Sequence, residues 1–294
     1  MTAPANKIIS VQQAASLVSD GDQVAIGGHT QRRHPMALIY ELVRQGKKDL
    51  SLVGWNNGID MDLLIGAGCV REVQTSYVGM GKHGLALNHR RAAQRGELKI
   101  FEESENTALE RFRAGAMGIS FIPSNGPLGS GLMQFERETR EITCPFTGKK
   151  MAALRAAQPD IALIHMHRGD AKGNLQLDSD IVMENIADVF IARSARKVVA
   201  SVEEIVSTEE IMNDATNTVV PNFFVDAVVE VKWGAHPCCC DTRYDYDFDF
   251  LDKYYAATKE ESSFEAFLQE YVHSVEDFDA YLKKAEWPTA QQVG

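Results

Sequence analysis

Four glutamates lie within nine positions of residues 99–118, KIFEESENTALERFRAGAMG, and are the clearest candidates for chemistry in this chain. They are Glu102, Glu103, Glu105 and Glu110, and an alanine-rich helical pattern follows at residues 107–118. Thr107 and Glu110 fit the Thr-x-x-Glu capping box, which predicts a structural role for Glu110. Glu105 stands just before the expected helix, where the helix dipole stabilises a carboxylate and where such a group could also move a proton. The residues alone leave both roles of Glu105 open.

Other catalytic and metal-binding patterns are weaker. No Gly-x-Ser-x-Gly elbow marks a serine nucleophile. The odd number of cysteines, with no secretory signal, predicts reduced thiols; they are Cys69, Cys144, Cys238, Cys239 and Cys240. Three adjacent cysteines cannot converge on one ion as spaced pairs do, and the segment HMH, His165 to His167, has no obvious third ligand. We therefore expect no metal site.

Glycine-rich and basic segments are candidates for binding an anion. Gly27 and Gly28 end a predicted strand, so their N–H groups could serve a negative oxygen, or the pair could only make a tight turn. The segment GPLGSG, residues 126–131, has neither the spacing of a dinucleotide fingerprint nor the lysine of a P-loop. Arg32 and Arg33 could bind cofactor phosphates or an acidic partner subunit. The second basic cluster, which a solvated helix face explains equally well, comprises Arg90, Arg91 and Arg95.

The elements that must position these residues alternate between strand and helix. Apolar runs predict strands at residues 23–28, 49–55, 70–78 and 97–102, and amphipathic segments predict helices at 34–46, 60–68, 84–96 and 107–118. Such units indicate an open, mostly parallel α/β sheet flanked by helices, which binds ligands beyond the carboxyl ends of its strands. Residues 121–132 are rich in Gly, Pro and Ser and predict a long loop, and residues 160–177 predict strand, turn and strand. We expect one domain over residues 1–294, with a helical C-terminal extension from about 245 to 294.

Composition limits the range of partners. The 294 residues carry a net charge of −11, which argues against nucleic acid or an anionic membrane as the main partner. No apolar run approaches the roughly 18 residues of a membrane span, and no basic region precedes the short N-terminal apolar patch. We therefore expect a cytoplasmic protein.

Taken together, these segments resemble the A chains of family I coenzyme A transferases, and specifically those of the glutaconate coenzyme A transferases. The matching stretches run from about residue 8 into the tail: GDQVAIGGHTQRRHPMALIYELVRQGKKDLSLVG, LERFRAGAMGISFIP, DIALIHMHRGDAKGNLQL and VDAVVEVKWGAHP followed by YDYD. The resemblance implies the family I coenzyme A transferase fold. It also implies a homologous B subunit, in an A1B1 or A2B2 assembly.

In that family a glutamate attacks the acyl-CoA thioester, and coenzyme A then passes through a glutamyl thioester to a second, small carboxylic or dicarboxylic acid. The resemblance places this glutamate on the B subunit, so that this chain supplies the wall of the site. The expected contacts to substrate or coenzyme A are Gly27, Gly28, Thr30, Arg32, Arg33, Asn56, Ser104, Asn106, Gly126, Gly129 and Ser130.

Glu105 supports an alternative reading. Typical A chains of the transferases resemble this chain but have a glutamine there, whereas the similar steroid ring-cleaving coenzyme A hydrolases carry an acidic residue. That similarity implies an acyl-CoA hydrolase or lyase that cleaves a carbon–carbon bond of a cyclic or diketo thioester, with Glu105 as the catalytic carboxylate. The tail GAHPCCCDTRYDYD is closer to the glutaconate enzymes. A third reading is a ligand-binding or regulatory module, because the same architecture serves metabolite sensors.

Overall fold

A mostly parallel sheet forms the centre of the computed structural model, which describes residues 6–135, 137–178 and 185–288. Its strands follow the order β6–β4–β2–β1–β10–β12–β14, and each neighbouring pair is parallel. They are β1 (Gln23–Ile26), β2 (Leu50–Val53), β4 (Val70–Thr75), β6 (Lys99–Glu102), β10 (Ile161–Gly169), β12 (Val198–Ile205) and β14 (Ala227–Glu230). Two short strands are antiparallel: β11 (Leu175–Gln176) pairs with the carboxyl end of β10, and β13 (Thr218–Val220) pairs with β11. The predicted open α/β sheet is confirmed.

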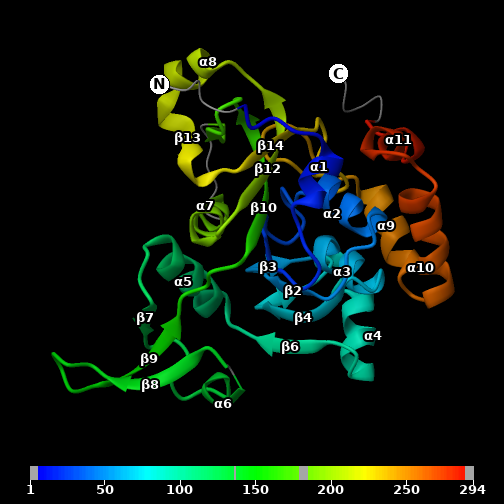
Figure 1. Ribbon diagram of the computed structural model, residues 1–294. Coiled ribbons are helices and arrows are strands. Elements are labelled where there is room, and N and C mark those ends of the chain that lie inside the picture. The colour runs from blue at the N-terminus through cyan, green and yellow to red at the C-terminus, as the bar shows by residue number, and fades with distance from the viewer. Residues whose placement is uncertain (1–5, 136, 179–184, 289–294) are drawn as a thin grey trace.

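Helices cover both faces of this sheet (Figure 1). Successive residues of a strand point to opposite faces, and β1 accordingly sends Val24 and Ile26 into one apolar cluster and Ala25 into the other. The first cluster includes residues of α1 (Val11–Ser16), α2 (Met36–Arg44) and α3 (Ile59–Gly66). The second includes Phe112 of α5 (Glu105–Ala116) and Ile191 of α7 (Asn185–Ser194). A further helix, α4 (Leu87–Arg95), packs on α3.

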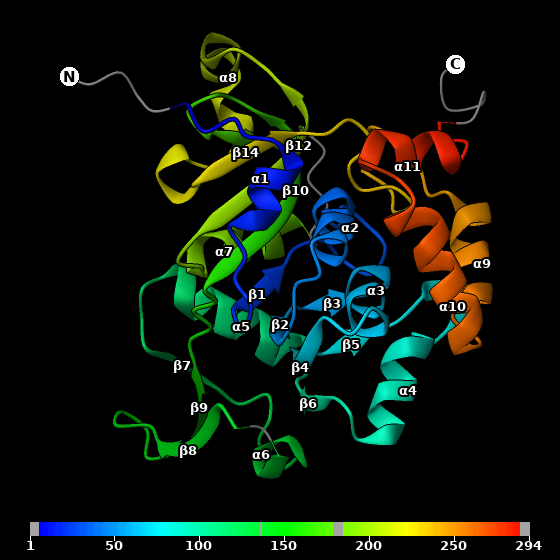
Figure 2. The same ribbon diagram turned by 45° about the vertical axis from the view of Figure 1, so that its right-hand side comes forward.

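A small antiparallel sheet projects from the main body beside α5 (Figures 1 and 2). It has the order β7–β9–β8, with β7 (Phe121–Ser124), β8 (Thr139–Thr143) and β9 (Lys150–Arg155), and α6 (Leu132–Phe135) lies in the connection between β7 and β8. The sequence predicted that residues 121–132 form only a loop, and this is wrong for β7. Pro123 is tolerated there because β7 is an edge strand, where a missing N–H need not break the ladder.

The C-terminal residues form the predicted helical tail, with α9 (Phe248–Ala257), α10 (Glu261–Leu268), a π-helical turn (Gln269–His273) and α11 (Phe278–Lys284). Its aromatic residues, including Tyr254 and Phe267, belong to the same apolar cluster as α2 and α3. The Tyr254 hydroxyl donates to Asp62 Oδ2 of α3 at 2.8 Å. Burial raises the pKa of Asp62 to about 6, although hydrogen bonds from His89 and Tyr254 oppose the shift.

The remaining elements are short. They are β3 (Asn56–Asn57), β5 (Tyr77–Val78), α8 (Thr208–Asn213) and three 3-10 turns at Gly81–His83, Ala215–Asn217 and Asn222–Phe224. Within the described residues, no helix has both the length and the apolar character that a membrane crossing requires.

Candidate active site

The helix that carries Glu105 begins earlier than the sequence predicted. Ser104 is its N-cap: the Ser104 hydroxyl accepts the Thr107 N–H at 3.1 Å, and Thr107 Oγ1 accepts the Ser104 N–H at 2.9 Å. The prediction of a Thr107–Glu110 capping box is therefore wrong, because Ser104 supplies a capping hydroxyl one turn earlier. Glu105 is then the first helical residue, and its charge lies at the positive end of α5.

The neighbouring glutamates have other surroundings. Glu103 is buried and pairs with Arg111 of α5, and it also accepts a hydrogen bond from Gln74 Nε2 at 2.8 Å. Glu102 is exposed at the end of β6. Glu110 lies one turn into the helix, where the Asn106 amide, with its nitrogen turned toward the carboxylate, donates at 3.1 Å. Of these glutamates, Glu105 is the one with an exposed side chain at the start of α5.

At the carboxyl edge of the sheet Glu105 contacts Asn56, which in turn contacts His29. Asn56 Nδ2 of β3 donates to Glu105 Oε1 at 2.9 Å and lies 3.0 Å from His29 Nε2, in the loop after β1. The His29 ring packs on Trp55, with 4.9 Å between ring centroids. The Glu105 side chain is exposed, whereas Asn56 is 3% exposed. An exposed carboxylate held by a buried amide is an arrangement suited to proton transfer.

The Gly27–Gly28 turn is closed by the protein itself. The Gly27 N–H donates to the Leu163 carbonyl at 2.9 Å, and the Gly28 N–H donates to Asp188 Oδ1 of α7 at 2.6 Å. A Cβ added at Gly28 would lie 2.5 Å from the Arg32 carbonyl oxygen, and the φ of Gly28 is +93°. These glycines therefore make a tight turn. In this structure neither N–H is available for the ligand oxygen that the sequence suggested.

The two adjacent arginines have different environments. Arg33 is 1% exposed and lies 2.6 Å from Asp188 Oδ2, and it also donates to the His165 carbonyl at 3.2 Å. Burial lowers the pKa of Arg33, but Asp188, together with Cys240 and Asp241, leaves the pKa raised. Arg32 donates to the Tyr246 hydroxyl at 3.1 Å and lines a cavity of about 410 Å³. Of the pair, Arg32 is the one that faces open space.

The other predicted contact residues are divided between two places. Thr30 lies beside the Glu105 cluster, because its N–H donates to the Asn56 carbonyl at 2.7 Å. Gly126 is close to Asn106, since an added Cβ would lie 3.9 Å from Asn106 Cγ. Gly129, with a φ of +78°, belongs to the loop after β7, and in the same loop the Ser130 hydroxyl donates to the Pro127 carbonyl at 2.7 Å.

A buried glutamate that the sequence analysis missed lies on β12. Glu203 Oε1 is 2.8 Å from both His165 Nε2 and the Tyr244 hydroxyl, and Glu203 Oε2 accepts the Trp233 N–H at 2.8 Å. Burial raises the pKa of Glu203, but the hydrogen bond and charge of His165, with the other donors, leave it lowered. The period-two pattern HMH drew attention to His165. Nothing in the sequence linked it to a glutamate on a neighbouring strand.

Among the residues that the structure describes, this cluster is also the group that could hold a metal. The ligand atoms of His165, Glu203 and Cys240 lie within 4.8 Å of one another. Both carboxylate oxygens already accept hydrogen bonds, and His165 Nδ1 lies 2.8 Å from the Ser201 hydroxyl. The donor set thus fits a hydrogen-bond network better than an ion, because the His165 nitrogens and both Glu203 oxygens already have partners.

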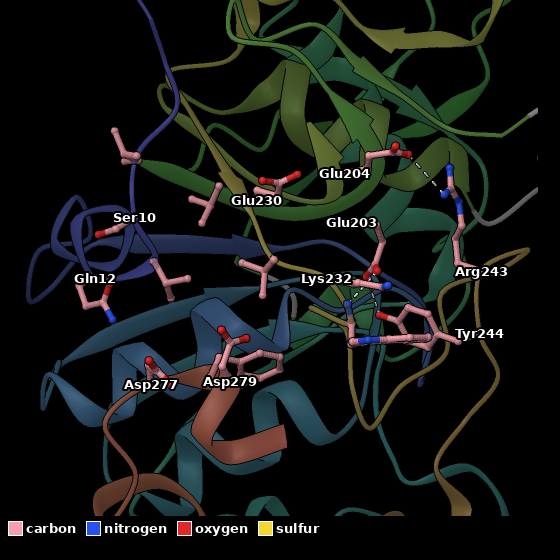
Figure 3. Close-up of a pocket in the computed structure, with 16 residues that line it drawn as sticks. Ser10, Gln12, Glu203, Glu204, Glu230, Lys232, Arg243, Tyr244, Asp277 and Asp279 are labelled. Atoms are coloured by element: carbon pink, nitrogen blue, oxygen red, sulfur yellow. Dashed lines mark hydrogen bonds and ion pairs between the residues drawn. The ribbon is translucent and has the colours of Figure 1, made fainter. Parts of the chain in front are cut away.

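A large cavity of about 890 Å³ opens between α1, the ends of β12 and β14, and α11 (Figure 3). Glu203, Lys232 and Tyr244 lie on its wall. None of the described residues that line this cavity is one of the predicted site residues. The acidic groups around its mouth are Glu204, Glu230, Asp277 and Asp279.

The fold defines an α/β protein, and the candidate site around Glu105 lies at the carboxyl edge of its parallel sheet. The family model described as Coenzyme A transferase matches residues 8–231. The chain therefore belongs to the coenzyme A transferase family, and the prediction of an enzyme of this family is confirmed.

Several curated relatives are similar over most of this chain. The A chain of glutaconate CoA-transferase from Acidaminococcus fermentans is 34% identical, over 95% of this chain and 92% of the relative. The cholesterol ring-cleaving hydrolase IpdA subunit from Rhodococcus jostii is 30% identical, over 97% and 98%. An uncharacterized protein from Archaeoglobus fulgidus is 38% identical over 95% of this chain, which spans 62% of that protein's length.

The crystal structure of glutaconate coenzyme A transferase from Acidaminococcus fermentans has the same fold. It superimposes with a TM-score of 0.91 at 32% identity, covering 97% of this chain and 94% of the solved chain. The predicted family I fold is therefore confirmed.

Proposed function

We propose that this chain is the A component of a two-subunit coenzyme A transferase. The enzyme moves coenzyme A between an acyl-CoA and a small carboxylic or dicarboxylic acid. The observation that carries the proposal is the similarity to the A chain of glutaconate CoA-transferase over 95% of this chain and 92% of the relative. A homologous B subunit completes the site and carries the nucleophilic glutamate, in an A1B1 or A2B2 assembly.

This division of labour is consistent with the geometry of the chain. A carboxylate that attacks a thioester needs donors for the developing oxyanion and a site from which water is excluded. Glu105 is exposed, and the N–H groups of Gly27 and Gly28 are already bonded within the chain. We therefore assign the nucleophile and the oxyanion donors to the B subunit, and the wall around Glu105, Asn56 and Thr30 to this chain.

A coenzyme A balance by mass spectrometry tests the proposal. The chain is co-expressed with its B subunit, and a panel of acyl-CoAs is supplied with and without free acetate or succinate. We expect a new thioester of the added acid that forms only when the acid is present. Free coenzyme A released at the same rate without any acceptor would contradict transfer.

The second candidate is hydrolysis or carbon–carbon cleavage of a cyclic or diketo thioester, with Glu105 as the base. Two observations favour it: the carboxylate at position 105 receives an amide donor, and the chain is 30% identical to the ring-cleaving hydrolase subunit. In this reading Glu105→Gln abolishes turnover while the complex still assembles. Glu110→Gln, five positions along the same helix, is the matched control and retains activity. Full activity in Glu105→Gln would exclude the second candidate.

A further inference from the structure

One amide group lies between two acceptors at the Glu105 site. Asn56 Nδ2 is 2.9 Å from Glu105 Oε1 and 3.0 Å from His29 Nε2. A carboxamide nitrogen carries two hydrogens and accepts none, so it can give one hydrogen to each neighbour. In this arrangement His29 Nε2 is the unprotonated ring nitrogen, and the ring proton of His29 lies on Nδ1.

The orientation of the amide is restricted on its other side. Asn56 Oδ1 lies 2.7 Å from the Ser76 hydroxyl, and the backbone carbonyl of Asn56 accepts the Thr30 N–H at 2.7 Å. If the amide reversed, Oδ1 would face Glu105 Oε1 and His29 Nε2, which are both acceptors in their unprotonated states. The reversed amide therefore requires a proton on each of these two atoms.

The ring of His29 is held independently of this amide. The ring packs on Trp55 with 4.9 Å between ring centroids, and the backbone N–H of His29 donates to the Arg32 carbonyl at 3.0 Å. The three groups come from the loop after β1, from β3 and from the start of α5. Asn56 is 27 residues from His29 and 49 residues from Glu105 in the sequence. They meet because the carboxyl ends of parallel strands share one edge of the sheet.

We propose that Asn56 and His29 are positioning residues that hold the Glu105 carboxylate in the orientation in which it accepts a proton. Asn56 provides the donor, and His29 fixes the amide by taking its second hydrogen. The inference rests on the proposed function only in that Glu105 must face the acyl-CoA. It deepens the second candidate, hydrolysis or carbon–carbon cleavage, because it names the residues that orient Glu105 as the base of that reaction.

The test uses the variant Asn56→Asp, which removes both donors and adds a carboxylate of nearly the same size, in the complex of this chain with its B subunit. We expect kcat to fall at least about tenfold with little change in KM, since a positioning residue acts on the reacting geometry rather than on uniform binding. Asn213→Asp, an exposed amide at the end of α8, is the matched control and keeps the wild-type kcat. A kcat of Asn56→Asp within a factor of about two of wild type would overturn the proposal.

Substitution of His29 separates positioning from packing. His29→Gln offers an acceptor oxygen to the Asn56 amide, whereas His29→Leu offers none, so we expect the first variant to recover part of the kcat that the second loses. Equal kcat in the two variants would show that the ring only packs on Trp55, and would contradict the assignment of His29.

A second readout does not depend on turnover. Long-range ¹⁵N NMR of the full chain reports which ring nitrogen of His29 carries the proton. We expect the Nδ1–H tautomer near neutral pH and protonation of Nε2 in Asn56→Asp, where the new carboxylate needs a donor. Protonated Nε2 in the wild-type chain would refute the arrangement. If no acyl-CoA reacts with either complex, the proposed function fails while this measurement still decides the inference.

Discussion

The buried pair of Arg33 and Asp188 gives the most demanding test of how this site is built. Asp188 holds two elements together, because Oδ1 accepts the Gly28 N–H at 2.6 Å and Oδ2 lies 2.6 Å from Arg33. The substitution Asp188→Asn keeps an oxygen for Gly28 and nearly the same volume, but it removes the charge that faces a guanidinium 1% exposed. The perturbation is therefore almost purely electrostatic.

The expected loss follows from the burial of the pair. Breaking a buried ion pair by removing one partner costs roughly 3–5 kcal/mol, because the remaining charge stays desolvated. At roughly 2 °C per kcal/mol for a chain of this size, the unfolding midpoint should fall by about 6–10 °C. Asp241 lies 3.6 Å from Arg33 and is 16% exposed, so Asp241→Asn should cost less than about 1 kcal/mol.

Thermal unfolding followed by circular dichroism, with urea denaturation at 25 °C as a second measurement, gives both quantities. Exchanging both residues for apolar ones, Arg33→Met with Asp188→Leu, should recover much of the loss, since the unpaired buried guanidinium is then absent. A fall of less than about 2 °C for Asp188→Asn, or an effect equal to that of Asp241→Asn, would refute the reasoning.

Further predictions concern backbone conformation and pH. Gly28→Ala should destabilise the chain by about 2 kcal/mol or more, whereas Gly21→Ala, also at positive φ but with no atom within 4 Å, should cost about 1 kcal/mol from backbone strain alone. The free energy of unfolding should fall by about 3 kcal/mol as pH rises from 3.8 through 6. The reason is that the pKa of Asp62 is raised in the folded state, which therefore binds a proton that the unfolded state has already lost. Asp62→Asn should remove this pH dependence. The pKa of Glu203 is lowered, so its contribution to the free energy of unfolding is present above pH 4.5 and is lost on further acidification. Glu203→Gln should reduce this loss of stability at acid pH.

Each of these has a clear contrary result. Equal losses for the two glycine variants would mean that the contacts of Gly28 relax without cost. An unchanged pH slope in Asp62→Asn would assign the slope to another group, and acid unfolding of Glu203→Gln that matches the wild type would do the same for Glu203. Denaturant titrations at a series of pH values measure all three differences.

The sequence predicted the sheet well because its signals are local. Apolar runs and terminal glycines locate β1, α2, α4 and β10 with small errors at their ends. The start of α5 was misplaced because two hydroxyl residues one turn apart, Ser104 and Thr107, can each cap a helix. Only the backbone conformation decides between them. Side-chain partners across the sheet could not be predicted, since the contacts of Glu105 and Glu203 join residues 30 to 49 positions apart.

Glycine roles were the hardest part of the site to predict. A glycine pair after a strand allows either a ligand or another part of the chain to approach the backbone. Asp188, 160 residues later, takes the position that a ligand oxygen would need. No pattern around Gly27 and Gly28 reports on that distant carboxylate, so the sequence could not choose between the two readings.

The same distance has a consequence for how the chain folds during synthesis. Strand β1 needs β10, which begins at Ile161, as its second neighbour, and the Gly28 turn is closed only by Asp188. At about 5–20 residues per second, the ribosome delivers that closing residue roughly 8–32 s after the turn itself. Until β10 has been made, β1 has an open edge, which can pair with other chains. This early turn beside the candidate active site is thus among the last parts to be completed, and chaperones that shield the nascent N-terminal half should raise the yield of folded protein.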